Sequence, residues 1–467
     1  MSKLIFDILV LIIEDLDNDY NSLFNCLLVN KFWCKTTVPI LWKDFLNYVH
    51  INYKFYSLLK IFFYYLPENS PSLRLFHENK VNLSFVSTQK PLFNYISFIK
   101  SIIIFDMSQV IKVCFNSNFT EIQKEIIDKE FNNIIFSQCS RIKYLDLSNE
   151  FYERKYDVVN FIQSKDHLSN LVEFTCAQCV DEKIFYILAE ICVNIKRLEI
   201  RRKNKNNHGL FRLIEAQNQL EYFCYKGRKS RLYDWNSFCK GMDSALIKHA
   251  SSLKHFDAPI RLCIPSTRLN SFINLETLML GYSTNDMNDL HLVTLPKLQY
   301  LKVCYLTNVK ELIQNTSGHL KKIEIYKPRV TADDIIPIIS IIHQHCPLLE
   351  YFCFPYVVEV NNSLGELLRN CKQLKKIFIN GFYLNGDTLL KILLKSISLQ
   401  HIEINGDWKF SIERLKEFLN NWKERRSSLY FKLDLNVECS KEALSNVFYK
   451  FIDDGVLKSD SCIANSK

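Results

Sequence analysis

The sequence predicts an α/β fold: a small N-terminal helical module followed by a curved solenoid, with parallel strands on its concave side and helices on its convex side. Three observations lead to this prediction. One apolar pattern recurs twelve times after about residue 139, the stretches between its copies have helical spacing, and residues 4 to 42 do not follow the repeat. Glycine supplies only 10 of 467 residues, which is consistent with a helix-rich array.

The repeated pattern is an apolar anchor, two variable residues, an apolar residue, one variable residue and another apolar residue, as in LKKIEI from Leu320. Its copies recur about every 26 residues, a spacing typical of leucine-rich repeats. They begin at Ile142, Leu171, Ile195, Leu220, Leu253, Leu275, Leu298, Leu320, Leu349, Leu374, Leu399 and, displaced by one residue, Tyr430.

Each copy predicts a strand, and the stretch that follows predicts a helix. The last two apolar residues of the pattern lie two positions apart, the period of a strand with one buried face. Ile335, Ile338, Ile339 and Ile342 follow the spacing of one helix face instead. A strand and a helix this short cannot bury their own apolar faces, but stacked copies can. The alternative is a set of unrelated amphipathic strands.

Four of the 16 cysteines lie three residues before an anchor, where a helix ends and a strand approaches. They are Cys139, Cys192, Cys346 and Cys371. Their position in the repeat explains them as small buried hydrophobic residues, with no disulfide and no metal needed.

Residues 4 to 42 predict a compact helical unit. Apolar residues between Ile5 and Leu16 mark the face of a first helix, Ser22 is placed to cap a second helix, and Pro39 predicts an extended exit. About 40 residues are too few for comfortable stability in isolation, so the unit should pack on a neighbour or a partner.

This segment resembles the F-box family. The resemblance is carried by Leu4, Asp7, Ile8, Leu9, Leu16 and Asp17, by CLLVNKFW from Cys26 to Trp33, and by PILW from Pro39 to Trp42. It implies that the module binds a Skp-type adaptor through exposed apolar side chains and thereby couples the chain to a cullin-RING ubiquitin ligase. The adaptor-binding residues it implies are Leu4, Ile8, Ile12, Leu28, Val29, Trp33, Pro39, Leu41 and Trp42.

The resemblance departs from the family at one position: many F-boxes have proline after the first leucine, and this chain has Ile5. An F-box followed by leucine-rich repeats is a familiar arrangement, so the resemblance extends to most of the chain. The alternative is a three-helix cap on the solenoid, with the same apolar residues in its core.

The expected organisation has four parts. Residues 1–43 form the F-box-like module, residues 44–138 a helical and irregular linker with degenerate first repeats, residues 139–455 the leucine-rich-repeat solenoid, and residues 456–467 a C-terminal tail. Repeat boundaries within 44–138 are not defined by the pattern.

The variable strand positions should project from the concave face, because the anchors are buried and side chains alternate along a strand. The third position of the pattern holds mostly aromatic and cationic residues: Tyr144, Arg197, Tyr222, His255, Tyr300, Lys322, Tyr351, Lys376 and His401. Tyr and Arg are enriched in protein-interface hot spots, so this row is the candidate substrate-binding surface. The alternative is an ordinary solvated sheet face.

A basic segment is a second candidate surface. Residues 196 to 231 carry a net charge of +8, which leaves only +1 for the rest of the chain. The predicted basic edge, at the ends of two consecutive strands, comprises Arg201, Arg202, Lys203, Lys205, Lys226, Arg228, Lys229 and Arg231. Such a cluster would suit an acidic or phosphorylated segment or nuclear import. Binding of RNA or DNA is a weaker alternative, because no nucleic-acid module accompanies it.

The functional hypothesis is therefore a non-catalytic substrate receptor. Nucleotide-binding, zinc-protease and nucleophile-elbow motifs are absent, so neither an enzyme nor a cofactor is expected. No apolar run reaches the length of a membrane-spanning helix, and the expected location is cytoplasmic, nuclear or both. The alternative function is a leucine-rich-repeat scaffold without ligase coupling. The sequence does not identify the substrate or show whether it must be modified.

Overall fold

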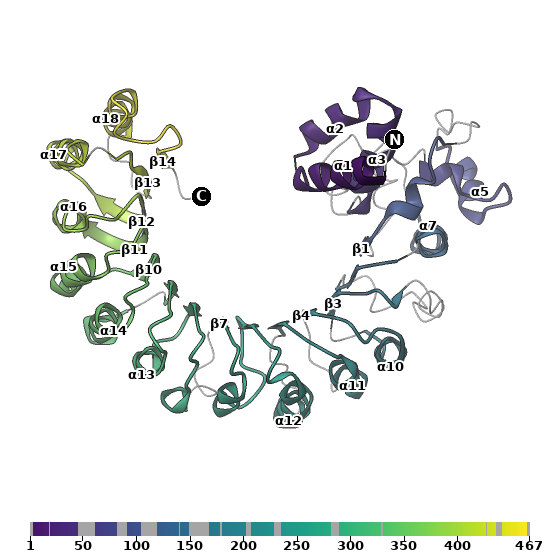
Figure 1. Cartoon of the computed structure of the whole chain (residues 1–467), viewed down its shortest axis with the longest axis horizontal. Coiled ribbons are helices and arrows are strands. Elements are labelled where there is room, and N and C mark those ends of the chain that lie inside the picture. Colours follow the sequence, from purple (N-terminus) through teal and green to yellow (C-terminus); the bar gives the residue numbers. More distant parts are fainter. Residues whose placement is uncertain are drawn as a thin grey trace. The chain divides into compact units, whose positions relative to one another are not determined.

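The computed structural model describes residues 3–17, 19–44, 61–81, 91–103, 119–139, 141–148, 168–177, 180–201, 207–227, 235–281, 289–327, 330–425, 427–435 and 441–464. The chain divides into two compact units, Met1–Leu220 with Lys229–Asp234 and Glu221–Arg228 with Trp235–Lys467. In each unit the strands pair in parallel and in chain order, and the helices lie on one side of the sheet (Figure 1). The predicted fold class, a leucine-rich-repeat solenoid, is confirmed.

The first unit begins with three helices, α1 (Lys3–Asp15), α2 (Tyr20–Val29) and α3 (Lys31–Lys43). Their common core contains Leu9, Ile13, Leu23 and Ile40. We call residues 3–44 the N-terminal module.

Helix α2 begins earlier than the sequence predicts. Its N-cap is Asp19, whose carboxylate accepts hydrogen bonds from the backbone N–H of Ser22 at 3.2 Å and from its hydroxyl at 2.6 Å. Ser22 therefore lies in the first turn and is not the cap. A carboxylate also favours the positive end of the helix dipole, which explains why Asp19 takes the capping position.

Helix α3 contains Pro39, so the extended exit predicted at this residue is wrong. The N-cap of the helix is Asn30, whose side chain accepts from the backbone N–H groups of Phe32 and Trp33 at 2.9 and 3.0 Å. A proline inside a helix removes one hydrogen bond to the carbonyl four residues earlier. The other bonds and the packing of Ile40 against the core hold the last turn in helical form as far as Lys43.

The stretch predicted as a helical and irregular linker with degenerate first repeats contains one repeat strand. It holds α5 (Pro71–Glu78), η2 (Tyr95–Phe98), β1 (Ser101–Ile103) and α7 (Glu121–Gln138). Strand β1 pairs with β2 (Tyr144–Leu147), with Ser101 opposite Tyr144. Ile99 occupies the anchor position two residues before the strand and is fully buried. The sheet thus starts within the segment where the degenerate first repeats were expected.

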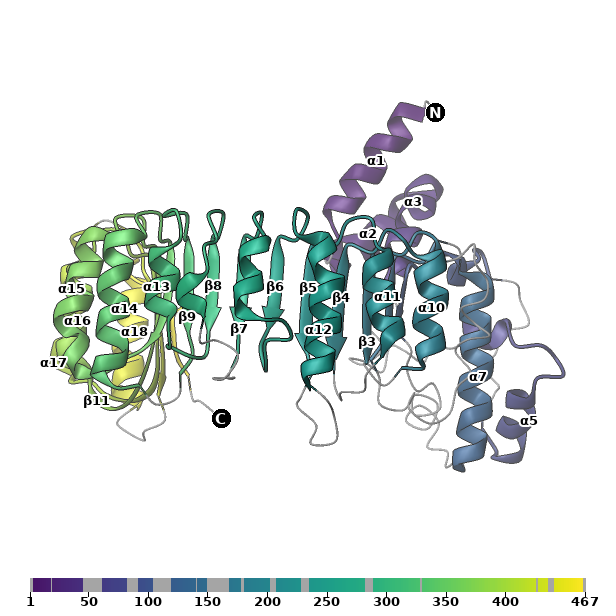
Figure 2. The ribbon, with the colours of Figure 1, turned by 90° about the horizontal axis from the view of Figure 1, so that it is seen from below.

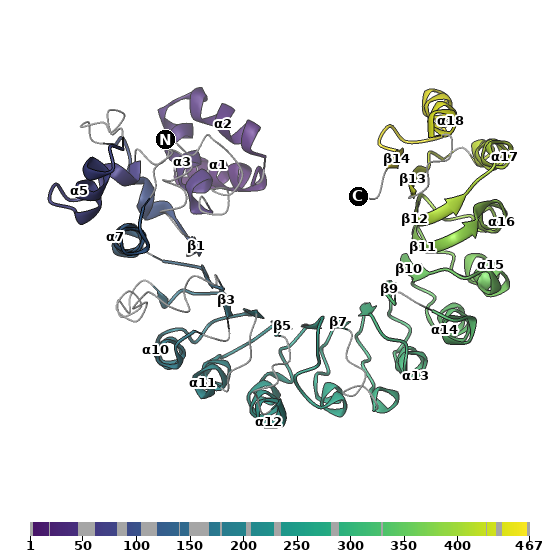
Figure 3. The same cartoon turned by 180° about the vertical axis from the view of Figure 1, so that it is seen from behind.

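The first unit continues with β3 (Glu173–Ala177), α10 (Glu182–Ile191), β4 (Arg197–Arg201) and α11 (His208–Ala216). Helices α7, α10 and α11 lie in succession along one side of the strands (Figures 2 and 3).

The second unit repeats the same alternation along a curved sheet with its helices on the convex side (Figure 1). Its strands are β5 (Tyr222–Lys226), β6 (His255–Ala258), β7 (Thr277–Leu280), β8 (Tyr300–Val303), β9 (Lys322–Ile325), β10 (Tyr351–Pro355), β11 (Lys376–Asn385), β12 (His401–Lys409), β13 (Tyr430–Leu435) and β14 (Cys462–Ala464). Its helices are α12 (Trp235–Leu246), η4 (Ile247–His249), η5 (Ser266–Ser271), η6 (Leu290–Leu292), α13 (Val309–Gln314), α14 (Ala332–His345), η7 (Val358–Val360), α15 (Asn361–Asn370), α16 (Gly386–Leu393), α17 (Ile412–Lys423) and α18 (Lys441–Asp453).

Repeat length limits the length of the helix. The anchors Leu253, Leu275, Leu298 and Leu320 are the most closely spaced, and the described residues between them form short helices: the 3₁₀ helices η5 and η6 and the six-residue α13. A short connection leaves room for about one or two turns, and 3₁₀ geometry is common in pieces of that size.

The core follows the repeat pattern. Leu320, Ile323 and Ile325 of one copy are all fully buried, and the neighbouring copies repeat this burial. The residues that lead into neighbouring strands share a hydrogen-bond ladder. The carbonyl oxygen of Lys321, for example, accepts from the backbone N–H groups of Glu350 at 2.8 Å and Tyr351 at 3.0 Å. Stacking therefore satisfies both the apolar faces and the strand backbones.

The last repeats differ from the predicted boundaries. Tyr430 lies opposite His401, so it occupies the third pattern position and not the anchor position. The buried Leu429 is the displaced apolar residue. Strand β14 pairs with β13, with Cys462 opposite Lys432, so the sheet extends into the segment predicted as a tail.

The four recurring cysteines end helices. Cys139, Cys192, Cys346 and Cys371 are the C-cap residues of α7, α10, α14 and α15. The thiol of Cys139 donates to the carbonyl of Ile96 at 3.3 Å, and that of Cys192 to the carbonyl of Leu168 at 3.2 Å. Burial raises the pKa of the Cys139 and Cys192 thiols to about 12. Each thiol thus stays protonated and can bond to the preceding repeat.

Among the described residues, no helix has the length and apolar character needed to cross a membrane.

Candidate functional site

The N-terminal module exposes an unusual number of apolar side chains. Seven of the sixteen large exposed apolar residues in the described part of the chain lie between residues 6 and 29. We call them the exposed apolar set: Phe6, Ile8, Leu11, Ile12, Phe24, Leu28 and Val29. Leu28 is 84% exposed, the highest value of the group. A concentration of this kind is typical of surfaces that another molecule covers.

A groove lies beside these residues. It has a volume of about 740 Å³ and is bounded by α1 and the start of α3. Its lining consists of Ile8, Leu9, Ile12, Asn30, Lys31, Phe32 and Trp33. The groove brings Ile8 and Ile12, two predicted adaptor-binding residues of α1, next to Trp33 of α3, which follows them by 25 and 21 residues in the sequence.

The predicted adaptor residues fall into two groups. Ile8, Ile12, Leu28 and Val29 are exposed. The others are more enclosed: Trp33 and Leu41 pack against the module core, and Pro39 is half-buried within α3. The side chain of Leu4 lies outside the described residues.

Trp42 is buried at 8% exposure, and its ring centroid lies 4.8 Å from that of Tyr95. It belongs to the contact between α3 and η2 and does not form part of the exposed surface.

Sequence reasoning missed Phe6, Leu11 and Phe24. Helical spacing could have identified two of them, because Leu11 lies three residues after Ile8 and Phe24 lies four residues before Leu28.

The module joins the first repeat through backbone and side-chain contacts. The carbonyl oxygen of Lys43, the last residue of α3, accepts from the backbone N–H of Lys100 at 2.7 Å. Ser101 donates from its hydroxyl to the carboxylate of Asp44. Within the first unit, the module therefore continues the hydrogen-bond ladder of the sheet.

The predicted strand-face residues align as expected within each unit. In the first unit, the register places Tyr144 beside Glu173 and Glu173 beside Arg197. In the second unit, one row contains Tyr222, His255, Thr277, Tyr300, Lys322, Tyr351, Lys376, His401 and Tyr430.

Neighbours in this row interact with each other. The rings of Tyr222 and His255 stack at 4.1 Å, and those of His401 and Tyr430 stack at 4.0 Å. His401 also lies 2.6 Å, Nε2 to Oε1, from Glu403 on the same strand. Stacking between strands fixes the side chains and limits the entropy that a partner would have to remove on binding.

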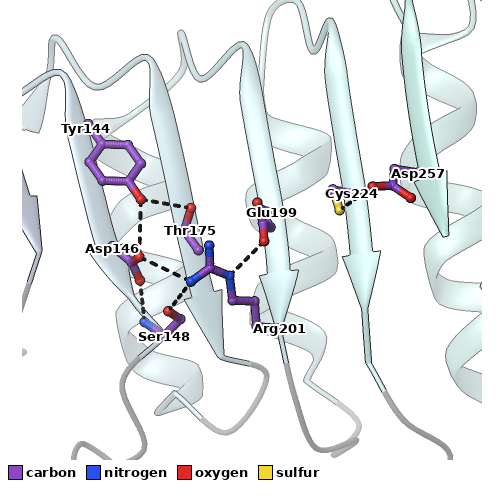
Figure 4. A network of polar contacts seen from close by, with 8 residues as sticks. All are labelled: Tyr144, Asp146, Ser148, Thr175, Glu199, Arg201, Cys224 and Asp257. Carbon is purple, nitrogen blue, oxygen red and sulfur yellow. Dashed lines mark hydrogen bonds and ion pairs between the residues drawn. The ribbon is translucent and has the colours of Figure 1, made fainter. Parts of the chain in front are cut away.

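The strand face of the first unit carries a polar network (Figure 4). The Tyr144 hydroxyl donates to Asp146 at 3.1 Å, and Asp146 accepts from the backbone N–H of Ser148 at 2.7 Å. The Arg201 guanidinium donates to Glu199 at 2.7 Å and to the Ser148 hydroxyl at 3.2 Å. Burial raises the pKa of Tyr144 to about 12, and the carboxylate of Asp146 acts in the same direction.

The predicted basic edge is described at two residues only, Arg201 and Lys226. The others, Arg202, Lys203, Lys205, Arg228, Lys229 and Arg231, lie outside the described residues. The guanidinium of Arg201 faces Glu199 and lies 3.6 Å from Asp146, so acids compensate its charge. Arg201 therefore belongs to the polar network and does not contribute an unpaired cation to the basic edge.

No protein-family model matches the sequence, and no curated protein matches it. Several solved structures resemble the fold. A chain of the crystal structure of a Rad7–Elc1 complex from yeast is 13% identical, with 78% of this chain and 96% of that chain covered and a TM-score of 0.40. A chain of the Toll–Spätzle complex of Drosophila is 14% identical, with coverages of 59% and 38% and a TM-score of 0.34. The leucine-rich repeat-containing protein LegL7 of Legionella pneumophila is 11% identical, with coverages of 62% and 93% and a TM-score of 0.36.

Proposed function

We propose that the chain is the substrate-recognition subunit of an SCF-type (Skp–cullin–F-box) ubiquitin ligase. In this proposal the N-terminal module binds a Skp-type adaptor, and the repeats bind the protein to be ubiquitylated. The chain itself is not catalytic, and it acts in the cytoplasm, the nucleus or both.

The exposed apolar set is the observation that supports the proposal most. A module that served only as a cap would bury its apolar residues against the solenoid. Here Ile8 and Ile12 are about half exposed, whereas Leu9 and Ile13 on the other side of α1 form the core. The cost of leaving apolar surface in water is recovered when a partner covers it.

Co-purification with the adaptor tests this proposal. The full chain is co-expressed with a Skp-type adaptor and purified, as wild type, as Leu28→Asp and as Ile397→Asp. Leu28 and Ile397 are 84% and 83% exposed, so the two substitutions place the same charge at equally exposed sites in different units. We expect the wild type and Ile397→Asp to retain the adaptor and Leu28→Asp to lose it. A folded wild type that retains no adaptor would contradict the proposal.

A scaffold without ligase coupling is the second candidate. The contact between Lys43 and Lys100 favours it, because that contact makes α3 a cap for the first strand. The two functions differ in one prediction: the scaffold requires the module for stability only, so Leu28→Asp would remove no partner.

A further inference from the structure

Two lysines on neighbouring strands of the second unit converge on one buried carboxylate. The ammonium group of Lys322 lies 2.7 Å from Oε1 of Glu324, and that of Lys302 lies 3.5 Å from Oε2. Glu324 is only 5% exposed. The register places Lys302 opposite Glu324, so the strand pairing itself brings the three charges together.

Tyrosine rings surround the two ammonium groups. Lys322 lies over the ring of Tyr300 at 4.2 Å and over that of Tyr351 at 4.9 Å, one ring on each neighbouring strand. Lys302 lies over the ring of Tyr326 at 4.8 Å. Burial raises the pKa of all three tyrosines well above its usual value, so the rings stay neutral. We call these six residues the lysine–tyrosine cluster.

The cluster carries more positive charge than Glu324 requires. Both lysines share Glu324 as their ion-pair partner, and the next carboxylates, those of Asp257 and Glu403, act on the rings of Tyr300 and Tyr351 from farther away. The side chains of Lys302 and Lys322 are 37% and 39% exposed, so both reach the strand face. Lys376, in the same row beyond Tyr351, is exposed and adds a further cation.

The ammonium groups are also held in place. A free lysine side chain loses considerable rotamer entropy on binding, whereas Glu324 and the tyrosine rings already fix these two. Two ordered ammonium donors on a partly enclosed face bind an anion better than two mobile surface lysines. The tyrosine rings beside them offer apolar contact area to the residues that flank the anion.

From this geometry we infer that the lysine–tyrosine cluster binds an anionic side chain of an extended peptide segment, a carboxylate or a phosphate. The anion contacts the ammonium groups of Lys302 and Lys322 from the solvent side, with Glu324 buried beneath them, and the flanking residues contact Tyr300, Tyr326 and Tyr351. The inference rests on the proposed function at one point: it takes the peptide segment to belong to the protein that the repeats recruit. Binding of the anion itself does not require the adaptor.

Fluorescence anisotropy with three labelled nine-residue peptides tests the inference. The peptides share one sequence and differ at the central residue, which is Gln, Glu or phosphoserine. We expect the full chain to bind the Glu or the phosphoserine peptide roughly fivefold to tenfold more tightly than the Gln peptide, with an advantage that falls at high salt. Comparison of the two anionic peptides shows whether the cluster prefers a carboxylate or a phosphate.

Lys302→Gln is the informative variant, because Glu324 keeps its closer partner Lys322 and the fold should persist. Lys310→Gln is the matched control: it removes the same charge from α13, where Lys310 lies 3.4 Å from Glu311. We expect Lys302→Gln to abolish the preference for the anionic peptides and Lys310→Gln to retain it. Equal binding of all three peptides, or an unchanged preference in Lys302→Gln, would overturn the inference.

The adaptor assay distinguishes a failure of the anion-binding inference from a failure of the proposed function. Lys302→Gln should retain the adaptor, and Leu28→Asp should retain the peptide preference. A chain that prefers anionic peptides but captures no adaptor would support the cluster and contradict the ligase role.

Discussion

The backbone N–H of Lys100 donates to the carbonyl oxygen of Lys43 at 2.7 Å, and this bond makes the last turn of α3 part of the sheet's hydrogen-bond ladder. In the next copy, the carbonyl of Lys100 accepts in the same way from Lys143 and Tyr144. The N-terminal module therefore has two faces with different roles. One continues the first repeat, and the other exposes apolar side chains.

Deleting residues 1–44 should destabilise the first repeat. The deletion leaves the N–H of Lys100 without its acceptor and uncovers Tyr95, which packs against Trp42. An open sheet edge with exposed apolar surface is costly. We expect a lower melting temperature and faster proteolytic cleavage near β1 than in the full chain. Unchanged melting and cleavage would show that the module does not cap the sheet.

Ile12 and Ile13 are adjacent but should respond differently to substitution. Ile13 is fully buried in the module core, and Ile12 is 50% exposed. Ile13→Ala should lower the free energy of unfolding of the module by about 2–5 kcal/mol, whereas Ile12→Ala should change it by less than about 0.5 kcal/mol. Chemical denaturation monitored by tryptophan fluorescence measures both. Similar losses for the two variants would contradict the orientation of α1.

The buried cysteines should resist thiol reagents. Burial raises the pKa of Cys346 to about 12 and that of Cys371 to about 11, so few thiolates form near neutral pH. Cys462 is exposed and should react at once. Alkylation followed by peptide mass spectrometry, with and without denaturant, distinguishes the sites. Rapid native labelling of Cys346 or Cys371 would argue against their place at the helix ends.

Alkaline pH should destabilise the first unit partly through Tyr144. Its folded pKa of about 12 exceeds the ordinary value of 10, so the folded state binds the proton more tightly than the unfolded state. The contribution of Tyr144 to the free energy of unfolding is complete below about pH 10 and is lost as pH rises towards 12. Denaturation midpoints between pH 8 and 12 should therefore fall less steeply in Tyr144→Phe than in the wild type. Tyr449→Phe, at a 66% exposed position, is the control and should leave the slope unchanged.

The sequence predicted all twelve repeat strands because burial imposes the same pattern on each copy. It did not predict β1, since its copy, with Ile99 as anchor, follows a long stretch without a clear period. It also did not predict β14, whose three residues are too few to show alternation. A regular pattern identifies a strand, but a strand held mainly by its neighbour leaves little signal in sequence.

The candidate sites, like the fold, could be predicted from the sequence only in part. The sequence identified the row of Tyr300, Lys322 and Tyr351, because alternation fixes which residues face outward. It could not show that Lys302 and Glu324 complete the cluster, since that requires the register between β8 and β9. In α1, apolar residues occur on both sides, so the sequence alone could not separate exposed Ile8 from buried Leu9.

The most direct test of the account is hydrogen–deuterium exchange of the full chain with and without a purified Skp-type adaptor. The account predicts adaptor-dependent protection in α1, α2 and the start of α3, across residues 6 to 33, with the strands of the second unit unchanged. Protection that is absent from these helices, or that appears on the strand face instead, would contradict it.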